Sequence, residues 1–347
     1  MKKVHVTASG EYDVIIGKGI LSACGNLISE IFPKGKTVIV SDDKVYALYG
    51  ETVEKSLQEN GFSVEHFTFP NGEKSKTVST YTQILEFFAK AGLTRSDFVV
   101  ALGGGVTGDM AGFAAATYLR GIKFVQIPTT FLSAIDSSVG GKTGVNLDAG
   151  KNLVGAFHQP SMVICDTDTF KTLDEKTFAD GVAEAIKYGM IKEPALLEKL
   201  AGDFDIDEVV EICVEIKRDV VGKDEFEHGE RKLLNFGHTI GHGVEKCSNY
   251  TITHGHAVAI GMAIITNAAE ILGICDSGMN RKLDELLTRC GLPTKCPYLA
   301  EELYKVALSD KKRSGDYITV VLPKTLGECI LKKITVDELL EYIKKGI

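Results

Sequence analysis

Residues 97–109 read DFVVALGGGVTGD, an apolar run that leads directly into a glycine-rich loop. The apolar part is typical of a buried strand, and the following residues 110–116, MAGFAAA, favour a helix after the loop. The loop fits the pattern G-x-G-x-x-G, whose glycines permit a tight turn and let backbone N–H groups approach a pyrophosphate at the start of a helix. A glycine turn needed only for packing is the alternative interpretation.

One feature of a standard dinucleotide fingerprint is missing from this stretch. An acidic residue is expected about 20 positions further on, where residues 126–130 read QIPTT. Asp42, which follows the earlier apolar run 38–40, could bind a ribose instead. We therefore expect dinucleotide binding, but not a simple Rossmann dehydrogenase.

Outward from the loop, strand and helix patterns alternate through the first half of the chain. The opening residues and segments 13–16, 37–40, 64–69, 98–102, 124–127 and 162–165 have strand character, and segments 46–60 and 78–91 are amphipathic. This alternation predicts a Rossmann-like α/β domain with a mostly parallel sheet over residues 1–172.

Beyond residue 172 helical periodicity dominates. We expect helices at 176–191, 208–221, 231–247, 256–272 and 279–290, a hairpin of 317–322 with 328–332, and a last helix ending near Lys345. The second domain, residues 173–347, is therefore predicted to be mostly α-helical.

The composition excludes several classes of protein. The net charge of -8 over 347 residues argues against a nucleic-acid partner. No apolar run approaches the roughly 18 residues that cross a bilayer, and the start lacks the apolar core of a signal peptide. Eight scattered cysteines without a Cys-x-x-Cys pair favour reduced thiols. We expect a cytoplasmic protein with neither a membrane nor a nucleic acid as partner.

Half of the eight histidines, at positions 238, 242, 254 and 256, lie within nineteen residues. His238 and His242 are one helical turn apart, and glycines at 237, 241 and 243 leave room beside them. Taken singly, each would be a helix-surface or cap residue, but together they favour a zinc site. Spacing does not decide which carboxylate joins them. Glu184 stands among small and apolar residues, although with Lys187 it could equally form a surface pair.

A candidate anion site follows in residues 136–146, DSSVGGKTGVN. Ser137 stands where a Walker motif requires glycine, so ATP binding is disfavoured. A smaller phosphate could be held by Lys142, Lys151 and Asn152. Further basic groups are Lys217, Arg231 and residues 311–313.

These motifs together resemble one family, 3-dehydroquinate synthase, the sugar-phosphate cyclase of the shikimate pathway. The resemblance extends from about Asp42 to Lys312. It rests on residues 72–76 (GEKSK), 103–109, 119–121 (LRG), 128–130 (PTT), 136–142, 150–152 (GKN), 183–189, 234–242 and 254–255. It implies a dehydroquinate synthase-like fold.

The resemblance also implies a role for each matching residue. Zinc, or cobalt in its place, would be bound by Glu184, His238 and His254. NAD would be bound by Asp42, Glu73, Lys76, Gly104, Gly105, Val106, Asp109, Thr129, Thr130, Lys142, Lys151 and Thr172. The catalytic residues would be His242, Lys142, Lys187, Glu227 and Asn235. The substrate would be bound by Arg120, Asp136, Asn152, Lys217, Arg231 and Lys312, or Lys311 in place of the last.

The implied enzyme is a carbon–oxygen lyase that converts 3-deoxy-D-arabino-heptulosonate 7-phosphate into 3-dehydroquinate and phosphate, on the way to chorismate and the aromatic amino acids. Transient oxidation by NAD, with zinc as Lewis acid, permits phosphate elimination; reduction and an intramolecular aldol closure follow. His242 would carry protons, with Glu227 and Asn235 as a relay, although the phosphate itself could take the C6 proton. The family implies a homodimer in which Arg120 reaches the neighbouring active site.

Three other functions remain as alternatives. A sibling cyclase would act on another sugar phosphate, but such relatives tend to alter the segment 139–143, which is intact here. A metal-dependent polyol dehydrogenase would have no use for the anion pocket, and a non-enzymatic dinucleotide-binding regulator would leave the clustered histidines unexplained. One departure from the family is His256, where His-Gly-Glu is common; its role is left open.

Overall fold

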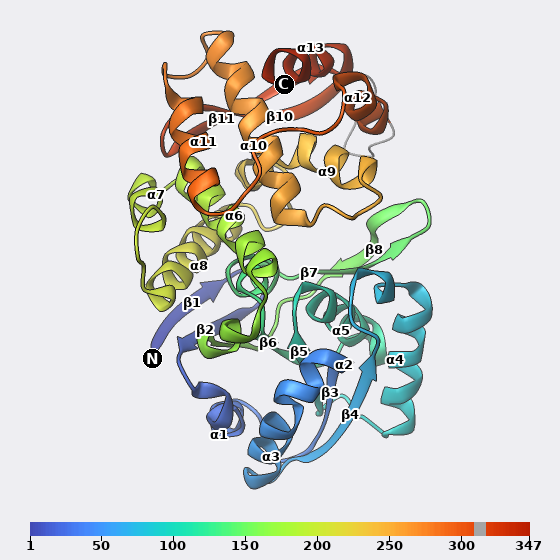
Figure 1. Ribbon diagram of the computed structural model, residues 1–347. Coiled ribbons are helices and arrows are strands. Elements are labelled where there is room, and N and C mark those ends of the chain that lie inside the picture. Colours follow the sequence, from blue (N-terminus) through green and yellow to red (C-terminus); the bar gives the residue numbers. More distant parts are fainter. Residues whose placement is uncertain (309–316) are drawn as a thin grey trace. The chain divides into compact units, whose positions relative to one another are not determined.

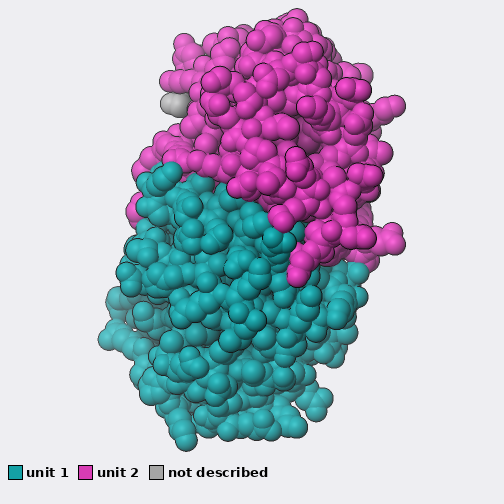
Figure 2. All heavy atoms as spheres, turned by 90° about the vertical axis from the view of Figure 1, so that its left-hand side faces the viewer, with its two compact units in different colours: residues 1–173, 206–225 teal, residues 174–205, 226–347 magenta. Residues whose placement is uncertain are grey.

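The computed structural model describes residues 1–308 and 317–347, so Lys311 and Lys312 lie outside the described residues. The chain divides into two compact units, coloured separately in Figure 2. Unit 1 contains Met1–Leu173 and Ile206–Glu225, and unit 2 contains Asp174–Asp205 and Phe226–Ile347. Residues 206–225 thus group with unit 1, whereas we expected every residue after 172 in the second domain. The reason is that helix α8 (Ile206–Lys223) packs on strands β1 (Lys2–Thr7) and β2 (Glu11–Gly17) of unit 1.

Unit 1 is built on a seven-stranded sheet with helices on both faces (Figure 1). In spatial order its strands are β1 (Lys2–Thr7), β2 (Glu11–Gly17), β9 (Met162–Asp166), β6 (Lys123–Pro128), β5 (Phe98–Gly103), β3 (Lys36–Asp42) and β4 (Ser63–Phe69). Within the described residues β1 pairs antiparallel with β2, and the other strand pairs of this sheet are parallel. The mostly parallel, Rossmann-like sheet is confirmed.

The central strands are apolar throughout because both of their faces are covered. Successive side chains of a strand point to opposite faces. Val40 and Val99 accordingly belong to the core beneath α4 (Val78–Lys90) and α5 (Gly105–Thr117), whereas Ile39 and Val100 belong to the core beneath α1 (Cys24–Ser29) and α3 (Glu51–Glu59). These two cores cover both faces of the sheet on which the loops at its edge are built.

The parallel strands bring their carboxyl ends to one edge of the sheet, where such sheets bind ligands. Asp42 ends β3 and leads into the single turn α2 (Asp43–Val45), Gly103 ends β5, and Pro128 ends β6 opposite Gly103. A separate hairpin, β7 (Lys142–Leu147) with β8 (Gly150–Phe157), packs on α5. We did not expect this hairpin, because its glycine-rich first strand resembles a phosphate loop.

Unit 2 is mostly helical, as expected. Its elements are α6 (Glu175–Ile191), α7 (Pro194–Leu200), α9 (His238–Cys247), α10 (His254–Ile271), α11 (Met279–Arg289), α12 (Ala300–Leu308), the hairpin β10 (Tyr317–Thr325) with β11 (Glu328–Thr335), and α13 (Val336–Gly346). Helix α10 is the centre of the unit, since it packs against α6, α9, α11 and α13 and is buried almost all round. No helix among the described residues is long and apolar enough to span a bilayer.

The single helix expected at 231–247 is wrong. The chain forms a 3₁₀ turn at Glu230–Asn235 and restarts as α9 at His238, because Gly237 takes the left-handed conformation with φ 76°. Glycine is also required for packing: a Cβ on Gly261 would lie 2.0 Å from the carbonyl oxygen of Gly237. The small residues noticed in the sequence therefore bring the backbones of α9 and α10 together.

Candidate active site

Three helices of unit 2 bring Glu184, His238 and His254 into one group. Glu184 lies in the middle of α6 and is fully buried, while His238 and His254 are the first residues of α9 and α10. Oε1 of Glu184 lies 3.4 Å from Nε2 of His238 and 3.3 Å from Nε2 of His254. One donor atom from each residue lies within 4.8 Å of the others. Two imidazoles and one carboxylate are a donor set that suits zinc or cobalt.

Both histidines are oriented by their second ring nitrogen. Nδ1 of His238 lies 3.0 Å from the carbonyl oxygen of Phe236, which only accepts, so Nδ1 is the nitrogen that donates to the backbone and Nε2 is the nitrogen that would bind a metal. Nδ1 of His254 lies 3.3 Å from Oε2 of the buried Glu245. Such partners fix the tautomer and the ring orientation of metal-binding histidines.

The carboxylate of Glu184 provides the test of whether a metal fits. Neither of its oxygens accepts a well-formed hydrogen bond within the described residues, although the side chain has no exposure to water. Burial alone would raise the pKa of Glu184, but the adjacent Lys187 ammonium and the two histidines outweigh it and hold the pKa well below its ordinary value. An ionised, buried carboxylate that faces a nitrogen of each of two imidazoles is a suitable metal ligand.

The other candidate residues of unit 2 surround this group in part. The ring of His242 lies 5.6 Å from that of His238 and 6.1 Å from that of His254, centroid to centroid. Asn235 donates from Nδ2 to Oε1 of Glu227 at 2.5 Å, so the two proposed relay residues are in contact. Arg231 is almost completely buried in the 3₁₀ turn before α9.

His256 is placed apart from the group of Glu184, His238 and His254. Its Nδ1 lies 2.8 Å from Oδ1 of Asp180, one turn before Glu184 on α6. Sequence reasoning assigned no role to Asp180 or to Glu245. Glu245 could have been found from spacing, because 238, 242 and 245 follow one face of α9 at i, i+4 and i+7. No sequence pattern points to Asp180, since its hydrogen-bond partners Thr253 and His256 lie more than 70 positions away.

In unit 1 the glycine loop is the expected strand–turn–helix. Strand β5 ends at Gly103 and α5 begins at Gly105, with Gly104 as its N-cap. No side chain caps this helix, and its first turn contains no acidic residue. The 13-residue helix thus presents uncapped N–H groups and the positive end of its dipole. This geometry fits a pyrophosphate bound at Gly104, Gly105 and Val106.

A buried lysine connects candidate residues beside this loop. Nζ of Lys76 donates to Oδ2 of Asp109 at 2.5 Å and to Oδ1 of Asn152 at 2.6 Å. Burial raises the pKa of Asp109, and the charge of Lys76 opposes that rise. Asn152 is held in the left-handed region with φ 54°. The structure thereby links two predicted NAD residues to a predicted substrate residue.

The remaining candidates of unit 1 form smaller groups. Asp42 accepts hydrogen bonds from the amide of Val45 at 3.0 Å and from Asn71 at 2.9 Å. Lys217 forms an ion pair with Asp136. Glu73 accepts from Asn146 at 2.7 Å, and Nζ of Lys151 lies 4.0 Å from the same oxygen.

The rest are placed as follows. The amide of Thr129 donates to the carbonyl of Gly103 at 3.0 Å, and the hydroxyl of Thr130 donates to that of Ser133 at 2.8 Å. The hydroxyl of Thr172 lies 2.6 Å from that of Tyr49. Lys142 is exposed at the start of β7, and Arg120 is exposed with φ 68°.

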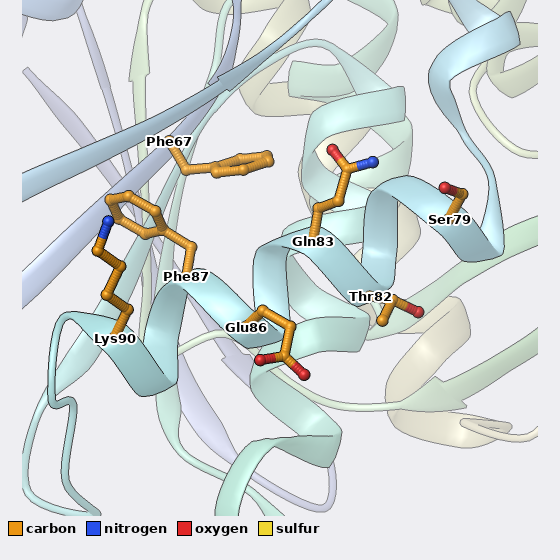
Figure 3. A pocket seen from close by; sticks show the side chains of 7 residues that line it. All are labelled: Phe67, Ser79, Thr82, Gln83, Glu86, Phe87 and Lys90. Atoms are coloured by element: carbon orange, nitrogen blue, oxygen red, sulfur yellow. The ribbon is translucent and has the colours of Figure 1, made fainter.

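An open hollow of about 660 Å³ lies on the outer side of α4, next to β4 (Figure 3). Phe67 and Phe87 form its apolar side, with ring centroids 5.5 Å apart. Its rim consists of Ser79, Thr82, Gln83, Glu86 and Lys90, all from the exposed face of α4. None of these seven residues belongs to the predicted site, and their polar groups do not converge as those of a ligand site do.

Comparison with known proteins identifies the family. Residues 66–180 match the 3-dehydroquinate synthase N-terminal family, and residues 181–313 match the 3-dehydroquinate synthase C-terminal family. The 3-dehydroquinate synthase of Streptococcus suis (strain 05ZYH33) is 44% identical over 343 residues, which cover 96% of this chain and 97% of that protein. The chain belongs to the 3-dehydroquinate synthase family. The resemblance noted in the sequence is thus confirmed.

Solved structures of related cyclases have the same fold. A 2-deoxy-scyllo-inosose synthase in complex with carbaglucose-6-phosphate, NAD⁺ and Co²⁺ superposes with a TM-score of 0.89 at 26% identity, covering 100% of both chains. The 2-epi-5-epi-valiolone synthase of Streptomyces hygroscopicus subsp. jinggangensis 5008, with NAD⁺ and Zn²⁺ bound, gives 0.88 at 26% identity, covering 99% of this chain and 98% of that one. The dehydroquinate synthase-like fold is confirmed.

Proposed function

We propose that the chain catalyses the conversion of 3-deoxy-D-arabino-heptulosonate 7-phosphate into 3-dehydroquinate and phosphate, as a carbon–oxygen lyase of the shikimate pathway. The observation that carries the proposal is the buried carboxylate of Glu184, which faces Nε2 of both His238 and His254. The likeness of the whole chain to a 3-dehydroquinate synthase supports it. The enzyme would serve the synthesis of chorismate and the aromatic amino acids.

Two bound groups complete the proposed enzyme. Unit 1 would hold NAD at the uncapped start of α5, and unit 2 would hold zinc or cobalt at Glu184, His238 and His254. When bound, NAD would accept and return one hydride, and the metal would act as a Lewis acid on the substrate oxygen. We accordingly assign NAD binding to unit 1 and metal and substrate binding mainly to unit 2.

Charged residues would bind and orient the substrate. The buried guanidinium of Arg231 offers a planar fork of donors that matches a phosphate or a carboxylate. Lys187 is buried beside Glu184, so its ammonium could donate to a substrate hydroxyl without competition from bulk water. In unit 1, Asn152 accepts from Lys76 through Oδ1, so its amide Nδ2 is the group that would donate to the substrate. Lys142, Lys217, Asp136 and Lys312 would complete the binding groups.

His242 is the proposed proton carrier. It is partly exposed one turn after His238, so a ring nitrogen can exchange its proton when the ring of the sugar opens and the carbocycle closes. The hydrogen bond from Asn235 to Glu227 supports the relay that would return that proton. The substrate phosphate, as an alternative, could take the C6 proton itself.

The test is a phosphate-release assay with the purified protein, zinc and a catalytic amount of NAD. We expect phosphate from 3-deoxy-D-arabino-heptulosonate 7-phosphate without lasting NADH absorbance, because the hydride is returned in each turnover. Stoichiometric NADH would contradict the proposal and favour a polyol dehydrogenase. Phosphate from another sugar phosphate, with none from this substrate, would favour a sibling cyclase.

We further propose a cytoplasmic homodimer in which Arg120 reaches the neighbouring active site. In support of the shared site, Leu119 and Arg120 are both held at positive φ, a strained turn that presents an exposed guanidinium. In support of a reducing compartment, none of the eight cysteines forms a disulfide. The test mixes two inactive variants, R120A and H242A. Regained activity in the mixture, through hybrid dimers, would support the shared site, and its absence would contradict it.

A further inference from the structure

The start of α10 is tied directly to α6 by the side chain of Asp180. Oδ1 of Asp180 accepts a hydrogen bond from the hydroxyl of Thr253 at 2.8 Å and from the backbone amide of His256 at 3.0 Å. Nδ1 of His256 lies 2.8 Å from the same oxygen. Asp180 is nearly buried, so its charge is satisfied by these three donors in place of water.

This arrangement replaces the usual cap of a helix. Thr253 is the N-cap of α10, but its hydroxyl makes no capping bond to the helix. The amide that an N-cap side chain normally satisfies is the third of the helix, here that of His256, and it is bonded to Asp180 instead. The carboxylate also lies at the positive end of an 18-residue helix, where negative charge is stabilising. Asp180 is therefore a cap supplied by another helix.

Close backbone contact fixes the same junction. A Cβ on Gly255 would lie 2.3 Å from Cα and 2.4 Å from the carbonyl oxygen of Asp180. No residue larger than glycine fits there without displacing α10 from α6. Backbone packing against Asp180 thus restricts position 255 to glycine, while the carboxylate of Asp180 holds Thr253 and His256 in place.

The junction joins the two helices one turn from the proposed metal ligands. Asp180 precedes Glu184 by one turn on α6, and His254 lies between Thr253 and Gly255 on α10. We propose that Asp180 and His256 are positioning residues that set the separation between Glu184 and His254, and hence the metal affinity. The inference rests on the proposed metal centre and explains His256: it is the partner of Asp180 at a position where the family commonly has glutamate.

The experiment measures zinc affinity of the full chain, stripped of metal, by competition with a chromophoric chelator. We expect D180A to bind zinc about 10-fold more weakly, the lower end of the range for direct partners of metal ligands, because Asp180 acts on His254 only through the neighbouring residues Thr253 and His256. D180N keeps the accepting oxygen and should recover most of the affinity. H256E places a second carboxylate against Asp180 and should weaken binding, whereas D180N/H256E should bind more tightly than H256E alone. The absorption spectrum of bound Co²⁺ should change in D180A, because it reports ligand geometry.

A matched control separates positioning from general loss of stability. Asp166 is a buried carboxylate that caps Gly19, Leu21 and Asp168 in unit 1, so D166A should lower the unfolding midpoint without changing zinc affinity. Equal affinity in D180A and the wild type, or an equal loss in D166A, would overturn the inference. If D180A does not fold, H256E decides by the same measurement. A wild-type chain that binds no zinc would instead contradict the proposed metal centre and the inference with it.

Discussion

The glycine loop of unit 1 and the histidine group of unit 2 are built in different ways. The loop is one continuous segment, in which β5, the turn and the first turn of α5 follow each other within residues 98–108. The metal group takes Glu184 from α6 and one histidine from each of α9 and α10, and Glu184 and His254 are 70 positions apart in the sequence (254 − 184). A continuous site is formed as soon as its local structure forms. A dispersed site exists only after three helices have packed.

The largest effect is expected where the dispersed group is broken directly. E184Q removes the carboxylate of the group and with it the ion pair that Glu184 forms with the buried ammonium of Lys187. We expect zinc affinity to fall by more than the roughly 100-fold typical of indirect partners, and phosphate release to fall with it. NAD affinity, measured by fluorescence titration, should stay within about twofold, since the loop is built separately. A parallel loss of NAD affinity would contradict that separation.

The same contrast explains what could be predicted from the sequence. The seven segments given strand character before residue 166, the opening residues included, are all strands of the sheet. The central ones were visible because strands buried on both faces are continuous apolar runs. The histidine cluster was visible for a similar reason, since 238 and 242 are one turn apart. The choice of Glu184, however, came from family resemblance, because no local rule connects α6 to α9. Asp180 could not be predicted at all, since its role depends on backbone contact between α6 and Gly255.

Helix boundaries show the same limit on a smaller scale. The periodicity of 231–247 is continuous, so the sequence predicted one helix, but Gly237 interrupts it at φ 76°. The break places His238 at the start of α9, where Nδ1 can donate to the carbonyl of Phe236. A pattern of apolar residues does not contain that information, because it depends on which glycine takes the left-handed conformation.

A smaller but specific loss is expected when the partner of a ligand is changed. E245Q keeps the shape of Glu245 but removes the negative charge opposite Nδ1 of His254. We expect zinc affinity to fall about 10- to 100-fold, less than in E184Q, as measured by chelator competition. E225Q, which alters a carboxylate of unit 1 bonded to Ser9 and Gln159, is the control and should leave the affinity unchanged. An unchanged affinity in E245Q would show that His254 needs no anionic partner.

A negative charge placed in the glycine loop should have a still smaller effect, in this case on NAD affinity. V106D puts a carboxylate into the first turn of α5, which has no acidic residue in the described structure. The charge suits the helix dipole but repels a bound pyrophosphate, so NAD affinity should fall about tenfold, corresponding to about 1.4 kcal/mol. V106N is the matched control, because its asparagine side chain has almost the same shape as the aspartate of V106D but carries no charge. Equal NAD affinity in both variants would mean that the pyrophosphate lies elsewhere.

The smallest effect is expected at Asp97, and it tests whether the glycine loop depends on residues that are distant in the sequence. Asp97 stands just before β5, and its carboxylate accepts from the amide of Lys36 at 2.8 Å and from the amide and hydroxyl of Thr94, both at 2.7 Å. It therefore ties the starts of β3 and β5 across 61 positions of sequence. Burial alone would raise the pKa of Asp97, but these hydrogen bonds outweigh it and leave the pKa below its ordinary value.

A group whose pKa is lowered by folding stabilises the folded state above its unfolded pKa, and this contribution disappears as the pH falls through the folded value. D97N should therefore cost about 1 kcal/mol of unfolding free energy at pH 7, because hydrogen bonds to a charged acceptor are stronger than those to a neutral one by about that amount. The cost should become progressively smaller below pH ~4. Denaturant unfolding at pH 7 and pH 3 measures the difference. A cost that is the same at both values would mean that the amide bonds alone, without the charge, hold the start of the strand. The start of β5, and with it the glycine loop that follows, would then not depend on the charge of Asp97.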